Sequence, residues 1–214
     1  MLKSVVFDFN GLLLNDLELH EEAYLRVGAD LGFPLSEAIV RQYVSCTANE
    51  KRLFYFGDIT DEVWEEIAQR KKAYYFHLAE QRELLYPDVE EVVTRLAETY
   101  PLGVISNTTR EYFERTFPET LAGLFQETLF ADEVKNPKPS PEPLVRILEA
   151  LGVEPQESCY VGDSLLDVKM AKAAGVRIFS VTTGYETRDE LTGAGADAVF
   201  ENLRAFARHI ENHT

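Results

Sequence analysis

Four polar segments of the chain carry side chains that together suit phosphoryl transfer. A carboxylate such as Asp8 can attack phosphorus and carry the group as an acyl phosphate. A hydroxyl and a lysine can offset the charge on the phosphoryl oxygens, and carboxylates such as Asp8 and Asp163 can hold Mg²⁺, which prefers oxygen ligands. The segments are Asp8-Phe9-Asn10-Gly11, Ser106-Asn107-Thr108, Pro137-Lys138-Pro139 and Gly162-Asp163-Ser164-Leu165-Leu166-Asp167.

The elements that must position these side chains are predicted from apolar patterns. Helical patterns, such as Pro141–Leu151 and Leu166–Ala174, separate the apolar runs. Such an alternation predicts a parallel sheet flanked by helices, with the site beyond the carboxyl ends of the strands. We therefore expect the four segments to converge at one edge of the sheet. The predicted strands are Ser4–Phe9, Leu102–Ser106, Thr128–Ala131, Ser158–Gly162 and Arg177–Val181.

A long helical insert separates the first two strands. Its apolar residues recur three or four apart and indicate about four helices, more than a crossover between strands requires. The expected fold is therefore α/β, with a Rossmann-like core of residues 1–15 and 83–214 and an inserted helical-bundle cap of residues 16–82. The tail, Asp197–Thr214, is expected to add a short edge strand and a final helix.

Composition and charge exclude several classes of function. A formal net charge of −16 argues against nucleic-acid binding, which requires a basic face. No apolar run approaches the length of a membrane span, and the N-terminus lacks a signal-peptide pattern, so a cytoplasmic location is expected. Cys46 and Cys159 lie far apart in the sequence and do not suggest a disulfide framework or a zinc site. The oligomeric state stays open.

The ordered set of motifs resembles the haloacid dehalogenase superfamily. The branch that contains beta-phosphoglucomutase and many sugar-phosphate and phosphoglycolate phosphatases is the most similar, and the helical insert resembles the cap of that branch. The resemblance implies that Asp8 is the nucleophile and a magnesium ligand. It makes Asp163 a second ligand, Asn10 a third through its backbone carbonyl, and Lys138 the charge-stabilising lysine.

The resemblance also implies a phosphate-binding set and a supporting acid. Ser106, Asn107 and Gly11 would bind the phosphoryl group. Asp167 would orient the metal-bound waters or Lys138. A simpler interpretation of Asp167 is a first-turn acid that interacts with the helix dipole.

Asn10 departs from the pattern of the family. Phosphatases of the family usually carry aspartate there, as general acid and then general base. An amide cannot exchange protons near neutral pH, and the loss of such catalysis costs about 10²–10⁴ in rate. The first interpretation is a phosphatase of a small phosphorylated metabolite. Three alternatives remain open: a mutase, a non-catalytic phosphate-binding protein, and an engineered trap of an active phosphatase.

The cap is expected to select the substrate. The segment Val44–Glu50 resembles the specificity loop of the family. Lys71 matches a substrate-binding lysine of the mutase-like branch, but Arg70-Lys71-Lys72 also has the character of a solvated helix face. A Schiff base on Lys51 or Lys71, as phosphonatases use, has no sequence cue for a lowered pKa. The hinges between core and cap are expected near Leu14–Asp16 and Arg82–Tyr86, and His20 is expected to pack near the first of them.

Overall fold

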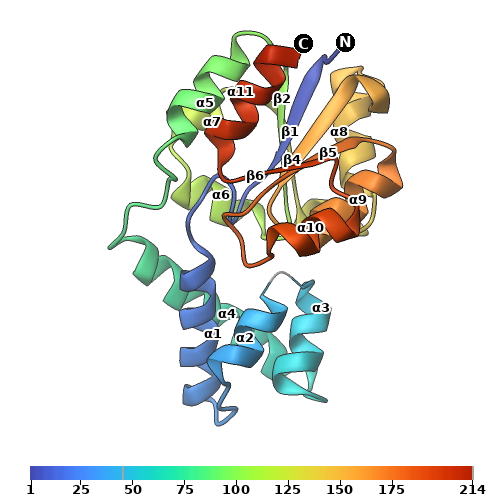
Figure 1. Ribbon diagram of the computed structural model, residues 1–214. Coiled ribbons are helices and arrows are strands. Elements are labelled where there is room, and N and C mark those ends of the chain that lie inside the picture. Colours follow the sequence, from blue (N-terminus) through green and yellow to red (C-terminus); the bar gives the residue numbers. More distant parts are fainter. Residues whose placement is uncertain (45, 214) are drawn as a thin grey trace. The chain divides into compact units, whose positions relative to one another are not determined.

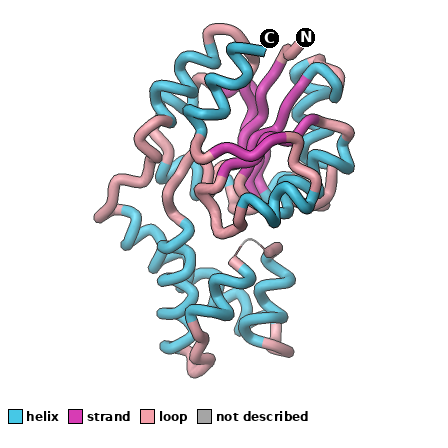
Figure 2. The backbone as a smooth tube through the Cα atoms, in the orientation of Figure 1, coloured by secondary structure: helices cyan, strands magenta, loops and turns pink. Residues whose placement is uncertain are grey.

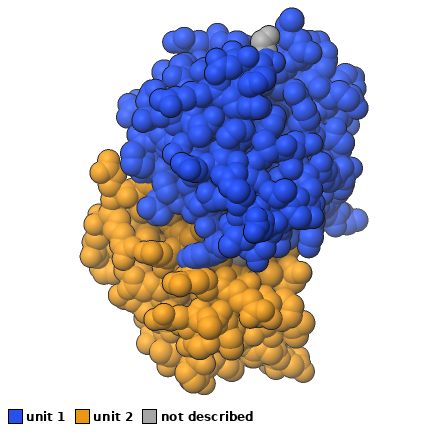
Figure 3. Space-filling model, in the orientation of Figure 1, with its two compact units in different colours: residues 1–15, 85–214 blue, residues 16–84 orange. Residues whose placement is uncertain are grey.

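The computed structural model describes residues 1–44 and 46–213 and contains two compact units. An α/β unit comprises residues 1–15 and 85–214, and a helical unit comprises residues 16–84 (Figure 3). Residue 45, within the predicted specificity loop Val44–Glu50, lies outside the described residues.

The α/β unit is built on a parallel sheet of six strands in the order β3-β2-β1-β4-β5-β6 (Figures 1 and 2). The central strands β1, β2 and β4 are buried along their whole length, as expected of a sheet covered on both faces. The α/β fold class is therefore confirmed. The strands are β1 Ser4–Asp8, β2 Leu102–Ser106, β3 Phe125–Phe130, β4 Ser158–Gly162, β5 Arg177–Val181 and β6 Ala198–Phe200.

Helices cover both faces of the sheet. On one face α8 and α9 pack with β1, β2, β4 and β5 around an apolar cluster that includes Val6, Ile105 and Tyr160. On the other face α5 packs against α11. The helices are α5 Val89–Ala97, α6 Arg110–Thr116, α7 Glu119–Ala122, α8 Glu142–Leu151, α9 Leu165–Ala174, α10 Arg188–Ala194 and α11 Leu203–His213, with 3₁₀ turns at Ala131–Glu133 and Pro155–Glu157.

The helix ends follow the expected glycine signals. Gly152 and Gly175 adopt left-handed conformations directly after α8 and α9, with φ of 66° and 70°. Glycine enters this region without the steric cost that a Cβ imposes. The third strand begins earlier than the apolar pattern suggested, at Phe125, because both Glu127 and Phe125 pair with β2, with a register irregularity at Gln126 between them.

The helical unit contains α1 Leu17–Asp30, α2 Glu37–Tyr43, α3 Ala48–Lys51 and α4 Asp61–Ala79. A short π-helix, Arg52–Phe56, continues α3. Aromatic side chains dominate the core of the unit, among them Tyr24, Tyr55 and Phe56. None of the helices in the described part of the chain combines the length and apolar character needed to cross a membrane.

Candidate active site

A buried lysine between two carboxylates lies at the centre of the candidate site. Lys138 Nζ is 2.7 Å from Asp8 Oδ1 and 2.8 Å from Asp167 Oδ1. All three residues are buried, with Lys138 only 3% exposed. A fixed cation beside a carboxylate lets a second anion approach that carboxylate at reduced electrostatic cost.

The parallel sheet explains why residues so distant in sequence meet. Asp8 is the last residue of β1, Ser106 is the last residue of β2, and Asp163 directly follows β4. These three strands are neighbours in the sheet, so their carboxyl ends share one edge. Ser106 and Asp163 are 3% and 2% exposed, and their side chains are thus held within the protein rather than in solvent.

Asp167 serves two networks at once. Its Oδ2 accepts hydrogen bonds from the backbone N–H and the hydroxyl of Ser164, at 3.0 and 2.6 Å, which closes the capping box of α9. Its Oδ1 accepts from Lys138 and, at 3.0 Å, from the hydroxyl of Tyr160. Asp167 therefore caps the first turn of α9 and also contacts Lys138.

The electrostatics follow from burial and close charges. Burial, together with the nearby Asp167 carboxylate, raises the pKa of Asp8 to about 7. Burial and the charges of Asp8 and Asp167 raise the pKa of Asp163 well above its usual value. For Lys138, burial opposes the charge, but Asp167 and Asp8 outweigh it and raise the pKa of the ammonium. Among the described residues of this unit, the negative charge of these acids is offset by Lys138.

The carboxylates fit a divalent cation. Asp8, Asp163 and Asp167 each offer an oxygen within 4.8 Å of the others. Asp163 Oδ1 is buried and has no hydrogen-bond partner among the described residues, whereas both oxygens of Asp167 accept hydrogen bonds. A buried carboxylate oxygen without a partner is costly, and a hard cation would satisfy it. Asp8 and Asp163 are therefore the best-suited pair of ligands.

Asn10 is held by two hydroxyl groups. Its Oδ1 accepts hydrogen bonds from Ser106 Oγ at 2.9 Å and from Thr108 Oγ1 at 3.0 Å. The two hydroxyls lie 2.7 Å apart, and the backbone N–H of Thr108 donates to Ser106 Oγ at 3.0 Å. The amide is thus fixed beside the end of β2. Thr108 belongs to the predicted polar segment Ser106-Asn107-Thr108, but no role at the site was predicted for it.

Asn107 and Gly11 make contacts within the protein. Asn107 Nδ2 donates to the backbone carbonyl of Lys138 at 3.0 Å and so supports the loop that carries the lysine. The N–H of Gly11, at φ 80°, donates to the carbonyl of Leu14 at 2.8 Å and closes a turn after β1. Phosphate binding by these two residues stays a prediction, as do the backbone contact of Asn10 with a metal and the roles of Asp8, Ser106, Lys138, Asp163 and Asp167.

A turn after β5 adds to the site and was not predicted. The hydroxyl of Thr183 donates to the carbonyl of Gly11 at 2.6 Å. A Cβ on Gly184 would lie 2.1 Å from Asp163 Oδ2, so only glycine permits this approach. Glu186 accepts from the backbone N–H of Leu165 at 3.4 Å, and burial raises its pKa. The turn follows β5, the fifth parallel strand, and this position in the sequence is the signal that could have identified it as part of the site.

The helical unit contains a second buried lysine, which corrects the expectation of a solvated face. Lys71 is 6% exposed, its Nζ lies 2.5 Å from His20 Nδ1, and the rings of Tyr24 and Tyr75 lie 5.1 and 5.2 Å from Nζ. The segment Arg70-Lys71-Lys72 is solvent-facing only in part, because Arg70 is exposed while Lys71 is buried. Packing of α1 against α4 brings His20 and Lys71 together, and helical periodicity alone does not reveal this pairing.

Burial lowers the pKa values of His20, Lys71 and Lys51 in this second cluster and so favours their neutral forms. It lowers the pKa of His20 to about 4, with Lys71 as the next cause. Burial and the charge of Lys51 lower the pKa of Lys71 well below its usual value, and burial lowers the pKa of Lys51 to about 8. His20 Nε2 also lies 3.3 Å from Asp16 Oδ2, which accepts a hydrogen bond from Tyr75 at 2.6 Å.

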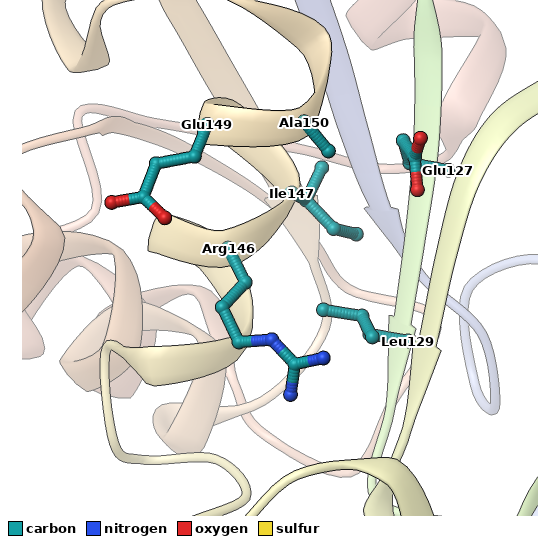
Figure 4. A pocket seen from close by; sticks show the side chains of 6 residues that line it. All are labelled: Glu127, Leu129, Arg146, Ile147, Glu149 and Ala150. Carbon is teal, nitrogen blue, oxygen red and sulfur yellow. The ribbon is translucent and has the colours of Figure 1, made fainter.

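An open groove on the α/β unit lies apart from these residues. It has a volume of about 440 Å³ between β3 and α8, and none of the acids of the candidate site lines it (Figure 4). Its side chains include the oppositely charged Arg146 and Glu149, both of which are exposed rather than buried like Asp8 and Lys138. The chemistry is therefore assigned to the carboxyl edge of the sheet. The lining residues are Glu127, Leu129, Arg146, Ile147, Glu149 and Ala150.

Comparison with known proteins gives relatives among phosphatases. The chain is 31% identical over 132 residues to a phosphoglycolate phosphatase of Escherichia coli, a match that covers 61% of this chain and 52% of that protein. The chain thus spans about half the length of such relatives. It is 29% identical over 206 residues to a phosphorylated carbohydrates phosphatase of Thermotoga maritima, covering 92% of this chain and 94% of that one.

A solved structure and a family model agree with these similarities. The structure is that of CbbY from Rhodobacter sphaeroides, an aspartate-to-asparagine mutant in complex with xylulose-(1,5)bisphosphate. It superposes with a TM-score of 0.81 at 27% identity, over 97% of this chain and 96% of that chain. Residues 5–181 match the model of the haloacid dehalogenase-like hydrolases. The chain therefore belongs to the family of haloacid dehalogenase-like hydrolases.

Proposed function

We propose that this protein is a magnesium-dependent phosphatase that transfers the phosphoryl group of a small phosphorylated metabolite to Asp8 and then, slowly, to water. The observation that carries the proposal is the buried Asp8 carboxylate held 2.7 Å from the ammonium of Lys138. A nucleophile paired with a fixed cation can accept a phosphate dianion that a bare carboxylate would repel.

In the first step an oxygen of Asp8 attacks phosphorus and the bond from phosphorus to the leaving oxygen breaks. The leaving oxygen keeps the electron pair and takes its proton from solvent, since Asn10 cannot supply one. Lys138 offsets the charge on the attacking and transferred oxygens, and Asp167 keeps the lysine in place from its other side. The Ser106 hydroxyl lies at the end of the neighbouring strand β2, and we assign it to a phosphoryl oxygen.

Asp8 and Asp163 would hold Mg²⁺, with the backbone carbonyl of Asn10 as a further ligand. When bound, the ion supplies positive charge that stabilises the phosphoryl oxygens in the transition state. The buried oxygen of Asp163 that lacks a partner among the described residues supports this assignment. Asp167 would remain outside the ligand set, since Lys138, Tyr160 and Ser164 already occupy its oxygens.

The second step, hydrolysis of the phosphorylated Asp8, should be slow. The water that attacks must lose a proton, and the amide of Asn10 cannot take it near neutral pH. The phosphorylated form should therefore persist for longer than in a protein with aspartate at this position.

The substrate class rests on the relatives. Those named above are a phosphoglycolate phosphatase and a phosphatase of phosphorylated carbohydrates, and the structural neighbour holds a sugar bisphosphate. We infer a small phosphorylated metabolite here, selected by the helical unit acting as a cap, in a cytoplasmic setting. Neither nucleic acid nor a membrane is a proposed partner.

The test is phosphate release from a panel of small phosphate esters, with and without Mg²⁺. The protein is compared with Asn10→Asp, Asp8→Asn and, as a control, Asp132→Asn, which changes a carboxylate outside the site. We expect Asn10→Asp to release phosphate about 10²-fold faster or more. Asp8→Asn should be inactive, and Asp132→Asn should match the starting protein.

Three results would overturn the proposal. If Asp8→Asn released phosphate as fast as the starting protein, Asp8 would not be the nucleophile. Complete inactivity of the starting protein and of Asn10→Asp, with phosphate still bound in the presence of Mg²⁺, would identify a non-catalytic binding protein. Return of the phosphoryl group to a second hydroxyl of the substrate, instead of phosphate release, would identify a mutase.

A further inference from the structure

We propose that the phosphoryl donors suited to this site are acyl phosphates, the mixed anhydrides of a carboxylic acid and phosphoric acid, because their leaving group departs without a proton. The inference rests on the proposed function, since it takes Asp8 as the phosphoryl acceptor. It adds the chemical class of the donor. The juxtaposition that carries it is the Asn10 amide, fixed by Ser106 and Thr108 at the strand ends beside Asp8.

The geometry of Asn10 defines what this residue can offer. Its carbonyl oxygen accepts two hydroxyl hydrogen bonds, from Ser106 at 2.9 Å and Thr108 at 3.0 Å. Its nitrogen carries hydrogens that can be shared in a hydrogen bond but not released near neutral pH. Asn10 can therefore stabilise an oxygen that already bears negative charge, but it cannot protonate an alkoxide as it leaves.

The other ionisable groups around Asp8 in the α/β unit are committed to different tasks. The ammonium of Lys138 is shared between Asp8 and Asp167. Asp167 accepts hydrogen bonds from Lys138, Tyr160 and Ser164. Asp163 is the second carboxylate suited to a cation. Glu186, in the turn after β5, accepts a hydrogen bond from the backbone N–H of Leu165 at the start of α9. Lys138, Asp163 and Asp167 each have such a task, so none of these three is assigned to protonate a leaving oxygen.

An acyl phosphate meets these limits. Asp8 Oδ attacks phosphorus, a new P–O bond forms, and the bond from phosphorus to the carboxylate oxygen of the donor breaks. That oxygen keeps the electron pair and leaves as a carboxylate, so no proton moves. A carboxylic acid has a pKa near 4, whereas a sugar alcohol would leave as a strongly basic alkoxide. Donor and product are both acyl phosphates, so the transfer is close to balanced in free energy.

The experiment measures leaving-group dependence in the first turnover, with Mg²⁺ present. Phosphorylation of Asp8 is followed by intact-protein mass spectrometry with acetyl phosphate and with glycerol 3-phosphate. Release of the phenol is followed with 4-nitrophenyl phosphate and phenyl phosphate, which differ in the basicity of the leaving group. The proteins are the full chain, Asn10→Asp, and Asn202→Asp, which makes the same change at an exposed position away from the site.

We expect acetyl phosphate to phosphorylate Asp8 at least about 100-fold faster than glycerol 3-phosphate in the starting protein, and 4-nitrophenyl phosphate to react much faster than phenyl phosphate. Asn10→Asp should reduce both ratios by at least about 10-fold, because an acid then assists poor leaving groups. Asn202→Asp should leave both ratios unchanged.

Comparable rates with acetyl phosphate and glycerol 3-phosphate in the starting protein would overturn the inference while leaving the proposed function intact. So would ratios that Asn10→Asp does not change, since another group would then supply the proton. Failure of the proposed function gives a different result, in which no donor phosphorylates Asp8 in either protein.

Discussion

The two units of this protein each bury a lysine, and the surroundings of the two side chains are opposite in character. Lys138 lies between the carboxylates of Asp8 and Asp167. Lys71 lies against a histidine and two tyrosine rings. Burial opposes the charge of both, yet the pKa of Lys138 is raised and that of Lys71 is lowered. Neighbouring charge, rather than burial, decides which ammonium remains a fixed cation.

The strongest test of this comparison replaces each lysine by methionine. Lys138→Met leaves buried carboxylates without their cation, so the free energy of unfolding should fall by about 3–5 kcal/mol. Lys71→Met removes a charge that burial disfavours and retains most of the volume, so the change should stay within about 1 kcal/mol. Urea unfolding at neutral pH measures both. Equal losses in the two variants would contradict the comparison.

A smaller effect comes from the pH dependence of the helical unit. The pKa of His20 falls from 6.5 to about 4 on folding, so the unfolded chain binds more protons between these values. Stability from this group is present above pH 6.5 and is lost as the pH falls, by about 2 kcal/mol at pH 5. Lys71, Lys51 and Asp16 are the charged groups that act on the ring.

Urea unfolding at pH 7.5 and pH 5.0, with His20→Gln as the comparison, isolates this contribution. The starting protein should lose about 2 kcal/mol more than the variant between the two pH values. Identical pH dependence in the two proteins would mean that His20 does not titrate as its buried position implies.

The smallest effect concerns Asp163 in the acidic surroundings of Lys138. Gly184→Ala places a Cβ 2.1 Å from Asp163 Oδ2, so one of the two must move. We expect the affinity for Mg²⁺, measured by calorimetry, to fall about 10-fold. Gly193→Ala is the matched control, because its Cβ meets nothing within 4 Å inside α10. It should leave Mg²⁺ binding unchanged and add about 0.5–1 kcal/mol of stability. Unchanged binding in both variants would remove Asp163 from the cation site.

The sequence predicted the sheet and the strand-end residues because both depend on local patterns. Apolar runs mark the strands, and parallel strands align their carboxyl ends, so Asp8, Ser106 and Asp163 could be grouped before the structure was known. The turn at Gly184 lies at the same edge, but a glycine is informative only through what it approaches. The structure alone reveals that its hydrogen atom faces a carboxylate.

The pairing of His20 with Lys71 could not be predicted for a different reason. Each residue lies within a helical pattern that the sequence predicted correctly, but which faces of α1 and α4 meet depends on tertiary packing. A lysine flanked by Arg70 and Lys72 has the local composition of a solvent-facing helix surface. Local charge density and depth in the fold are separate properties, and only the first is visible in sequence.

The turn after β1 has a consequence for how the chain tolerates insertion. Leu14 forms an antiparallel bridge with Leu85, and the N–H of Tyr86 donates to the carbonyl of Leu13 at 3.4 Å. The chain therefore leaves and re-enters the α/β unit at hydrogen-bonded neighbours. The entropy of closing an excursion grows only with the logarithm of its length. The segment between Leu14 and Leu85 can thus be lengthened, shortened or exchanged during evolution at little entropic cost, so this pair of residues is a favourable place for the insertion of a domain.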